Sequence, residues 1–221
     1  MSSDPAPAIA VSTVIFGLRA IERSEHVVLS LPLVKRVREP YLGRWALPGG
    51  PLAATESLRE AARRNLRATT GLDPKHLEQL YTFGAVERSP VDRVVSIVYW
   101  ALVRTDEADR ARIGENVRWF AADALPQLAF DHDEIVGWAL KRLRNKVEYT
   151  RIAHALLADE FTLADLREVH EAILGRRLDP ANFRRRIEAT GTVEATGRHL
   201  EGGRHRPPAL YRSTAQKELL L

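Results

Sequence analysis

The sequence contains no cysteine and a single methionine among its 221 residues. Without cysteine the chain has neither disulfide bonds nor a thiolate zinc site. Long hydrophobic runs are also missing, because no segment approaches the roughly 20 apolar residues that a membrane-spanning helix needs. The first ten residues, MSSDPAPAIA, lack the basic stretch and apolar core of a secretory signal. We therefore expect a cytoplasmic protein with no membrane partner.

The net charge is small, and the basic excess is concentrated near the C-terminal end. The formal net charge is +4. Residues 1–148 carry 21 basic and 19 acidic side chains, whereas residues 176–221 carry ten basic and five acidic ones. A polyanion such as DNA would therefore meet the last part of the chain. A solvated, arginine-rich surface would show the same excess, so charge alone leaves both interpretations open.

The first 148 residues are predicted to combine strands and helices in one domain. Residues 9–18, 26–34 and 92–104 are β-branched and apolar, which predicts three strands. The stretch ESLREAARRNLRATT favours a helix, with Thr55 as the candidate N-cap and Gly71 at the C-terminal end.

A second helix is predicted over residues 131–144. Its buried stripe would consist of Ile135, Trp138, Ala139 and Leu143. Strands alternating with amphipathic helices predict a fold of the α/β (α+β) class for residues 1–148.

Residues 149–221 are predicted to form a second domain. Helices are expected over residues 150–158, 161–174 and 179–191, with Thr162 and Asp179 as the N-caps of the last two. Two short strand-like segments then flank a glycine-rich basic loop. Three helices followed by a β-hairpin is the order of a winged helix-turn-helix domain.

A motif of fixed spacing lies in residues 50–72. It reads Gly, five residues, Glu, seven residues, then Arg-x-aliphatic, and ends in Gly-aliphatic; the positions that match are Gly50, Glu56, Arg64, Leu66, Gly71 and Leu72. With WALPGGPL at 45–52 and AFDHDEIVGWALKRLR at 129–144, this segment resembles a Nudix domain. The resemblance implies an α/β/α sandwich.

Three positions of this motif depart from the Nudix pattern. The family has glutamate where this chain has Asn65, Ala68 and Thr69. Hydrolysis of a nucleoside diphosphate linkage uses a divalent metal, usually Mg²⁺, whose ligands are hard anionic oxygens. Positions 65, 68 and 69 share one helix face, so one clustered ligand set is lost. We therefore expect that the chain has no metal site and is not an enzyme. Glu60 is expected to form surface ion pairs with the arginines at 63 and 64 rather than to replace a metal ligand.

A pocket for a nucleotide can persist without metal ligands. Glycines allow close approach of the backbone to a ligand, an aromatic ring offers a stacking face, and arginines bind a diphosphate through paired donors. The candidate effector-binding residues are Arg36, Arg44, Trp45, Gly49, Gly50, Glu87, Arg88 and Arg93. Solvated surface arginines and core packing of Trp45 are the structural alternatives. Either way, no cofactor is expected, and the ligand would act as an effector.

The third helix of the second domain is the candidate DNA-recognition helix. Phe183 and Ile187 fall on its buried face, whereas Arg185 lies opposite, beside two alanines. Arginine reads guanine and asparagine reads adenine in the major groove, and further arginines contact phosphates. The candidate DNA-binding residues are Asn182, Arg184, Arg185 and Arg186 on the helix, and Arg198, Arg204, His205 and Arg206 on the wing. The alternative is a protein-interaction domain with solvated arginines.

The two halves together resemble the Nudix-related transcriptional regulators of bacteria over nearly the full chain. That resemblance implies a homodimeric, nucleoid-associated repressor of NAD biosynthesis or salvage genes that binds a palindromic operator in double-stranded DNA. It also implies that the Nudix-like domain senses ADP-ribose or a related NAD metabolite. Two other functions stay open from the residues: a Nudix hydrolase acting on ADP-ribose or another nucleoside diphosphate derivative, and a metabolite-binding adaptor that contacts protein.

Overall fold

A mixed seven-stranded sheet organises the N-terminal part of the computed structural model, which describes residues 6–20, 27–74, 77–111, 114–200 and 207–214. The central path of the sheet has the order β3-β2-β1-β6-β5, with β4 paired to β1 and β7 paired to β2. The strands are β1 (Ala8–Ala20), β2 (Val27–Lys35), β3 (Trp45–Ala46), β4 (Gly49–Pro51), β5 (Glu78–Phe83), β6 (Val94–Leu102) and β7 (Val117–Ala121).

The long strand β1 joins the two halves of this sheet. Its first part runs parallel to β6, from the pair Ala8–Val94 to the pair Phe16–Leu102. Its last four residues pair antiparallel with β2. Burial of one strand on both faces explains its nearly continuous apolar sequence.

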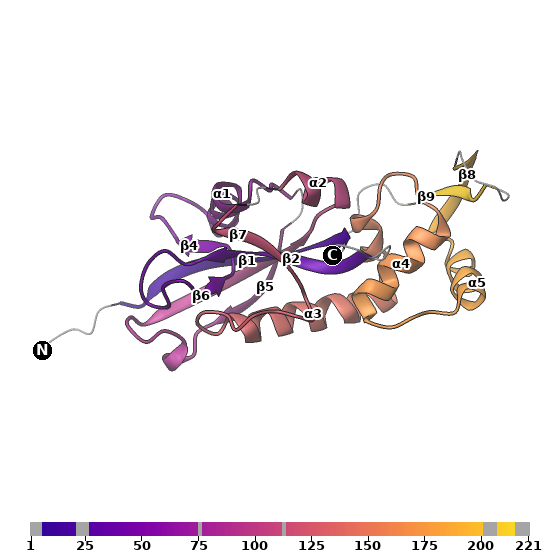
Figure 1. Ribbon diagram of the computed structural model, residues 1–221. Coiled ribbons are helices and arrows are strands. Elements are labelled where there is room, and N and C mark those ends of the chain that lie inside the picture. The colour runs from indigo at the N-terminus through magenta and orange to yellow at the C-terminus, as the bar shows by residue number, and fades with distance from the viewer. Residues whose placement is uncertain (1–5, 21–26, 75–76, 112–113, 201–206, 215–221) are drawn as a thin grey trace, which may run out of the picture.

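Helices cover both faces of the sheet (Figure 1). α1 (Leu58–Thr70) and α2 (Thr105–Arg110) lie on one face, and α3 (His132–Tyr149) lies along the other. Each face has its own apolar core, one containing Ile15 and Leu66 and the other containing Trp100 and Ile135. This arrangement confirms the expected α/β/α sandwich.

The capping of α1 differs from the sequence-based expectation. The N-cap is Ser57, not Thr55, and Ser57 forms a capping box with Glu60. The expected ion pairs of Glu60 with the following arginines were wrong. The Glu60 carboxylate accepts hydrogen bonds from the Ser57 backbone and hydroxyl at 2.7 and 2.8 Å, whereas Arg63 pairs with Asp73 and Arg64 with Glu56. The left-handed C-cap at Gly71, with φ of 73°, is as expected.

Helix α3 is longer than predicted and ends at Tyr149. Ile135, Ala139 and Leu143 are buried as expected, but Trp138 is 49% exposed, so its place in the buried stripe was wrong. The helix expected over residues 150–158 is a short 3₁₀ helix, η2 (Ile152–Leu156). The expected boundary between residues 148 and 149 thus falls in the last turn of one continuous helix. A further 3₁₀ turn, η1 (Val86–Arg88), precedes β6.

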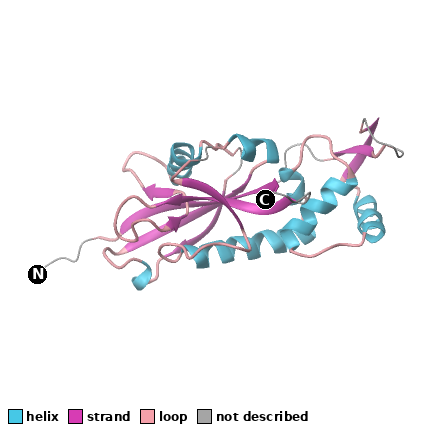
Figure 2. Ribbon diagram, in the orientation of Figure 1, coloured by secondary structure: helices cyan, strands magenta, loops and turns pink. Residues whose placement is uncertain are grey.

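The C-terminal part contains α4 (Leu163–Leu174), α5 (Pro180–Thr190) and the antiparallel hairpin of β8 (Val193–His199) and β9 (Ala209–Ser213). The caps are those that the sequence predicts: Thr162 accepts from the Asp165 N–H, and Asp179 accepts from the Asn182 N–H. Figure 2 shows that this end is mainly helical, with the hairpin beyond α4. Within the described ranges, the structure has no helix that is both long and apolar enough to cross a bilayer.

Candidate effector cavity and nucleic-acid interface

A cavity of about 310 Å³ opens where β1, β4 and β6 meet the loops before β3 and α3. Its floor is polar, because the buried hydroxyls of Ser12 and Ser96 lie 3.2 Å apart. Its wall includes Gly49 and Gly50 of β4 and the side chains of Arg36 and Arg88. The cavity therefore combines hydroxyls, backbone and two guanidinium groups, which suits a polar, anionic ligand.

The two cavity glycines are required by the protein's own packing. A Cβ at Gly49 would lie 2.8 Å from the Val11 carbonyl oxygen, and a Cβ at Gly50 would lie 2.7 Å from Oδ1 of Asn65. Both distances are too short for a side chain. The glycines thus let β4 lie directly against β1 and α1, and this packing forms the wall of the cavity.

The loop before α1 is fixed by an ion pair between motif residues. Nε and Nη2 of Arg64 donate to the two carboxylate oxygens of Glu56 at 2.9 and 2.6 Å. Arg64 also donates to the Pro51 carbonyl at 3.1 Å. Hydrogen bonds from Arg64 and from the Ala53 N–H lower the pKa of Glu56 to about 2. Glu56 is therefore a constant anion that holds the loop, with its oxygens already occupied.

The three positions where the Nudix pattern has glutamate carry no carboxylate. Asn65 is buried, and its Oδ1 accepts from Arg64 at 3.0 Å. The Thr69 hydroxyl donates back to the Asn65 carbonyl at 2.7 Å, and Ala68 is exposed. Among the residues that the structure describes, no group of three histidine or acidic side chains is placed to hold a metal ion.

Arg88 is held in a buried ion pair next to α3. Its Nε and Nη2 donate to Asp131 at 2.8 and 2.7 Å, and the two side chains are 4% and 15% exposed. A paired, planar geometry of this kind is the strongest form of the arginine–carboxylate interaction. Asp131 is also the N-cap residue of α3, so the pair ties the cavity wall to the start of that helix.

Arg36 lies on the other side of the cavity, over an aromatic ring. Its Nε donates to the Pro40 carbonyl at 2.7 Å, and its guanidinium is 4.6 Å from the centroid of the Phe130 ring. Phe130 adopts a positive φ of 57°, which is uncommon for a bulky residue and positions the ring beneath the guanidinium. Partial burial lowers the pKa of Arg36, which nevertheless stays protonated at neutral pH.

His132 is a cavity residue that the sequence analysis missed. Its Nδ1 accepts a hydrogen bond from the Leu47 N–H at 3.0 Å, so the neutral ring carries its proton on Nε2. Burial lowers the pKa of His132 to about 4, and the ring is therefore neutral at physiological pH. The sequence shows only that His132 stands at the start of a predicted helix, and its contact with Leu47, the residue after β3, depends on tertiary packing.

The other four predicted effector residues do not line this cavity. The guanidinium of Arg44 lies 5.2 Å from the Tyr41 ring centroid, and Trp45 packs edge-to-face on Phe120. Arg93 donates to backbone carbonyls, at 2.8 Å to that of residue 84. Glu87 is exposed in η1. The structure thus brings Arg36, Gly49, Gly50 and Arg88 together and leaves the remaining four outside.

The predicted recognition helix α5 packs on the rest of the domain through one face and exposes the opposite face to solvent. Phe183 and Ile187 are buried, and the ring of His170 on α4 packs against Phe183 at 5.1 Å. On the exposed side, Nη2 of Arg185 donates to Oδ1 of Asn182 at 2.7 Å, which places an arginine and an asparagine side by side. That pair is suited to reading base edges.

Of the other predicted DNA-binding residues, Arg184 and Arg186 lie on α5 and Arg198 lies on β8. Arg184 forms an ion pair with Glu188 at 2.8 Å, and the Arg186 guanidinium lies 5.7 Å from the Phe183 ring centroid. Arg198 on β8 is ion-paired with Glu160. The predicted wing residues Arg204, His205 and Arg206 lie outside the described residues.

The chain matches two protein families in succession. Residues 12–139 match the NUDIX domain, and residues 153–213 match the NrtR DNA-binding winged helix domain. An ADPR responsive transcriptional repressor, NtrR, from Acinetobacter baylyi is 33% identical over 97% of this chain and 85% of its own length. The chain belongs to the NrtR family.

Solved structures agree with this assignment. NrtR of Shewanella oneidensis complexed with a 27mer DNA is 31% identical and superimposes with a TM-score of 0.76, covering 93% of each chain. The NUDIX domain of the same protein complexed with ADP ribose is 32% identical, with a TM-score of 0.54 over 64% of this chain and 91% of that one. A further relative by sequence, for which the comparison is of sequence and not of structure, is an ADP-ribose pyrophosphatase from Methanocaldococcus jannaschii, 33% identical over 59% of this chain and 71% of its own length.

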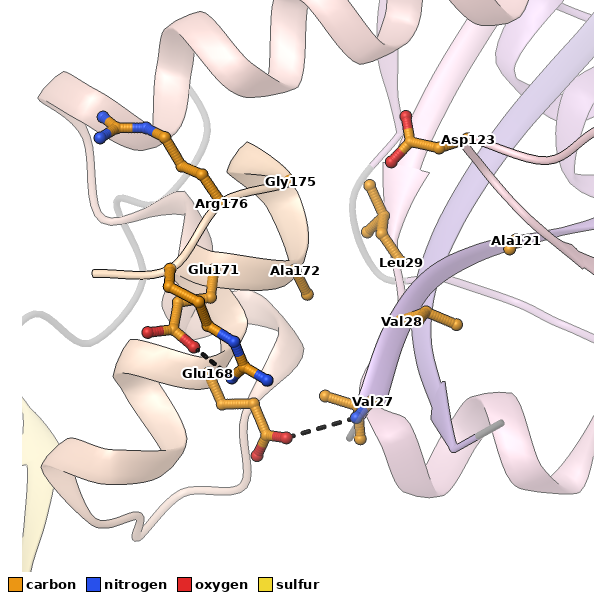
Figure 3. A pocket seen from close by; sticks show the side chains of 11 residues that line it. Val27, Val28, Leu29, Ala121, Asp123, Glu168, Glu171, Ala172, Gly175 and Arg176 are labelled. Atoms are coloured by element: carbon orange, nitrogen blue, oxygen red, sulfur yellow. Dashed lines mark hydrogen bonds and ion pairs between the residues drawn. The ribbon is translucent and has the colours of Figure 1, made fainter. Parts of the chain in front are cut away.

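In this NrtR-family chain the two domains are joined through α3 and held by polar contacts. Arg144 of α3 donates to the Ile173 carbonyl of α4 at 2.9 Å and to Asp123 at 2.7 Å. The Val27 N–H at the start of β2 donates to Glu168 of α4 at 3.3 Å. Between these contacts lies a cavity of about 410 Å³, with β2 on one side and α4 on the other (Figure 3).

Proposed function

We propose that this protein is a DNA-binding repressor of NAD biosynthesis or salvage genes whose affinity for DNA is controlled by ADP-ribose or a related NAD metabolite. The observation that carries the proposal is the continuity of α3. This helix begins beside the cavity, with Asp131 as its N-cap, and near its other end Val147 belongs to the apolar cluster that also contains Leu166 and Phe183 of the winged helix. Eighteen residues of helix span about 27 Å.

The proposed effector site uses Arg36 and Arg88 as donors to the diphosphate. Arg36 is already placed by Pro40 and Phe130. Arg88 is committed to Asp131, so a bound diphosphate would compete with that carboxylate for the same guanidinium. Gly49 and Gly50 form a wall without side chains, which the ligand can approach closely. The neutral His132 ring and the hydroxyls of Ser12 and Ser96 offer polar contacts at the floor.

The same competition supplies a route to the DNA-binding domain. Weakening the Arg88–Asp131 pair frees the N-terminal end of α3, whose C-terminal half contacts α4 and is tied to it by the hydrogen bond from Arg144 to the Ile173 carbonyl. A shift of α3 therefore changes the position of α5 relative to the sheet. By linkage, DNA and ADP-ribose then alter one another's affinity by the same factor.

The proposed DNA contacts divide into two kinds. Arg185 and Asn182 of α5 would read base edges in the major groove, and Arg184, Arg186 and Arg198 would bind phosphates. Arg184 and Arg198 would exchange their present acidic partners for phosphates in doing so. We propose that residues 1–148 form the Nudix-like effector domain and residues 149–221 the winged helix domain. Each copy of the chain then carries one DNA-binding domain.

We further propose that the Nudix domain does not hydrolyse its ligand. Asn65, Ala68 and Thr69 offer no carboxylate for Mg²⁺, and Glu56 is occupied by Arg64. The competing function is a hydrolase, favoured by the retained Glu56–Arg64 pair and by the likeness to an archaeal pyrophosphatase. Turnover of ADP-ribose with Mg²⁺ or Mn²⁺ at a rate typical of Nudix enzymes would decide for the hydrolase.

A gel-shift titration tests the repressor function directly. The DNA is taken from upstream of the protein's own gene neighbourhood and of NAD-biosynthesis genes, and each fragment is titrated with and without ADP-ribose and NAD. We expect a specific complex whose affinity changes when ADP-ribose is added and falls steeply as salt rises. Absence of any DNA complex at low salt would reject the proposal.

A further inference from the structure

A small pocket lies beside the recognition helix, where α3, η2, α4 and α5 meet. Its volume is about 180 Å³, and it is lined by the last turn of α3, by Arg151 and His154, by His170 of α4 and by the second half of α5. None of its described lining residues lines the effector cavity. Cavities that hold whole nucleotides or drug-sized ligands measure roughly 300–1,000 Å³. This pocket therefore has room for a small ion and a few water molecules.

Two histidine rings line the pocket without a hydrogen bond to any described residue. His170 is 5% exposed and packs on Phe183, whereas His154 packs on Phe161. Nδ1 of each ring is buried and has no partner within the described ranges. Buried polar groups nearly always have a hydrogen-bond partner, so two unpartnered rings at one pocket point to a ligand that is bound there.

The charge that lines the pocket is mainly positive. Arg151 and Arg186 both line it, and neither guanidinium forms a hydrogen bond or ion pair with a described residue. Glu148 is the one acid among the described lining residues, and it is ion-paired with neither arginine. Two unpaired guanidinium groups at one pocket are a donor set suited to the oxygens of a phosphate group.

Burial keeps both histidine rings neutral at physiological pH. It lowers the pKa of His170 to about 4, with the Arg186 guanidinium and the His154 ring acting in the same direction. It also lowers the pKa of His154 to about 4, and Arg151 is the further cause. A neutral imidazole offers one N–H donor and one acceptor nitrogen, so the two rings match an anion that carries both oxygens and a proton. Hydrogen phosphate has this composition.

We propose that this pocket, defined by Glu148, Arg151, His154, His170 and Arg186, binds a single phosphate group. The two guanidinium groups are its charged donors, and the two imidazoles are its further hydrogen-bond partners. The phosphate is either a free inorganic ion or one phosphate of the DNA backbone, and the second source rests on the proposed function. An occupied pocket ties α5 to the end of α3, the helix that begins beside the effector cavity.

Inorganic phosphate is the probe for this site. Full-length protein is titrated with it by calorimetry at constant ionic strength, without DNA or ADP-ribose. We expect saturable binding, and R151Q and R186Q should each raise the dissociation constant about tenfold or more, because each variant removes a charge-assisted donor. E148Q removes the acid from the lining and should lower the dissociation constant. A gain of affinity requires a folded pocket, so E148Q keeps the test decisive if an arginine variant loses its fold.

The control is R176Q, which makes the same change of charge in the same domain. Arg176 is exposed just after α4, forms no hydrogen bond or ion pair with a described residue and lies outside the pocket. R176Q should bind phosphate as the wild type does. Absence of saturable binding, equal losses in R176Q and R151Q, or binding that neither R151Q nor R186Q weakens would each overturn the proposed site.

Sulfate, whose charge does not change between about pH 5 and 7, tests the part played by the histidines. An anion beside the rings favours their protonated form, so binding raises the pKa of His154 and His170 and takes up protons. The affinity for sulfate should therefore rise as pH falls through this range. H170F removes one of the two groups and should reduce the rise. An affinity that is independent of pH would overturn the role assigned to the rings.

Titrations with DNA separate the two sources of the phosphate. Operator and scrambled duplexes are titrated in phosphate-free buffer at two salt concentrations. If a DNA phosphate occupies the pocket, R151Q loses affinity for both duplexes equally and its salt slope falls by about one. If free phosphate occupies the pocket, added phosphate changes the affinity of the wild type for DNA more than chloride of equal ionic strength does, and R151Q lacks this difference.

Failure of this site and failure of the repressor function can be told apart. A protein that binds phosphate through Arg151 and Arg186 but forms no complex with DNA rejects the repressor function alone. A DNA-binding repressor whose R151Q variant behaves as R176Q does in every titration rejects the phosphate site alone.

Discussion

Asp131 accepts two hydrogen bonds from Arg88, at 2.8 and 2.7 Å, one residue before α3 begins. The D131N variant keeps the shape of the side chain but leaves a nearly buried guanidinium without its anion. Breaking a buried pair in this way should lower the free energy of unfolding by about 3 kcal/mol. Because a diphosphate would replace the missing charge, ADP-ribose should raise the melting temperature of D131N more than that of the wild type.

The control for this experiment is D123N, which removes the partner of Arg144. That pair is more exposed, with side chains 36% and 59% accessible, so its loss should cost less than about 1 kcal/mol. Thermal unfolding with and without ADP-ribose measures both effects. An equal ligand-induced shift in D131N and the wild type would contradict the proposed competition at Arg88.

Arg36 and Arg44 form a matched pair for locating the effector site. Both precede the Nudix motif and both lie over aromatic rings, but only Arg36 lines the cavity. Loss of a charge-assisted hydrogen bond costs about 1.5–3 kcal/mol, so R36A should weaken ADP-ribose binding about tenfold to a hundredfold. R44A should bind as the wild type does. Titration calorimetry on both variants checks this, and equal losses would place the ligand elsewhere.

The sequence predicted best what depends on neighbouring residues. The caps at Thr162, Asp179 and Gly71 follow from local hydrogen bonds and backbone conformation, and all three are found. The cap of α1 was misplaced by two residues although Ser57 and Glu60 have the spacing of a capping box.

Residues whose role depends on distant elements were predicted less well. Trp138 is half exposed and stacks on Tyr81, a residue 57 positions away, and helical periodicity does not contain such a contact. His132 likewise enters the cavity because Leu47 donates to it across 85 positions. The motif located Gly50 at the site, whereas the partner of Arg88 depends on the docking of α3 on the sheet.

His170 provides a test of how stability depends on pH. It is 5% exposed, its Nδ1 has no hydrogen-bond partner among the described residues, and burial lowers its pKa to about 4. Between pH 6.5 and 4 the unfolded chain therefore binds a proton that the folded chain does not, so the free energy of unfolding falls as pH falls. Each such histidine contributes up to roughly 1.4 kcal/mol per pH unit in this window.

Replacing His170 by phenylalanine removes one of these contributions. H170F should flatten the dependence of the unfolding free energy on pH between 6.5 and 4, while His132 and His154, whose pKa values burial also lowers to about 4, keep part of the slope. Urea unfolding at several pH values measures the slope. A slope equal to that of the wild type would mean that folding does not lower the pKa of His170.

Arg185 is the residue on which the assignment of the recognition helix depends. Its side chain is held beside Asn182 on the exposed face of α5, above the buried Phe183 and Ile187. If Arg185 reads a base, R185A should weaken binding to the operator by about 1–3 kcal/mol and leave binding to unrelated DNA nearly unchanged. R184A should instead weaken both equally, because a phosphate contact carries no sequence information.

Fluorescence anisotropy on operator and scrambled duplexes at two salt concentrations separates the two cases. Equal losses for R185A on both duplexes would move Arg185 to the phosphate backbone, and unchanged affinity on both would show that α5 does not enter the groove.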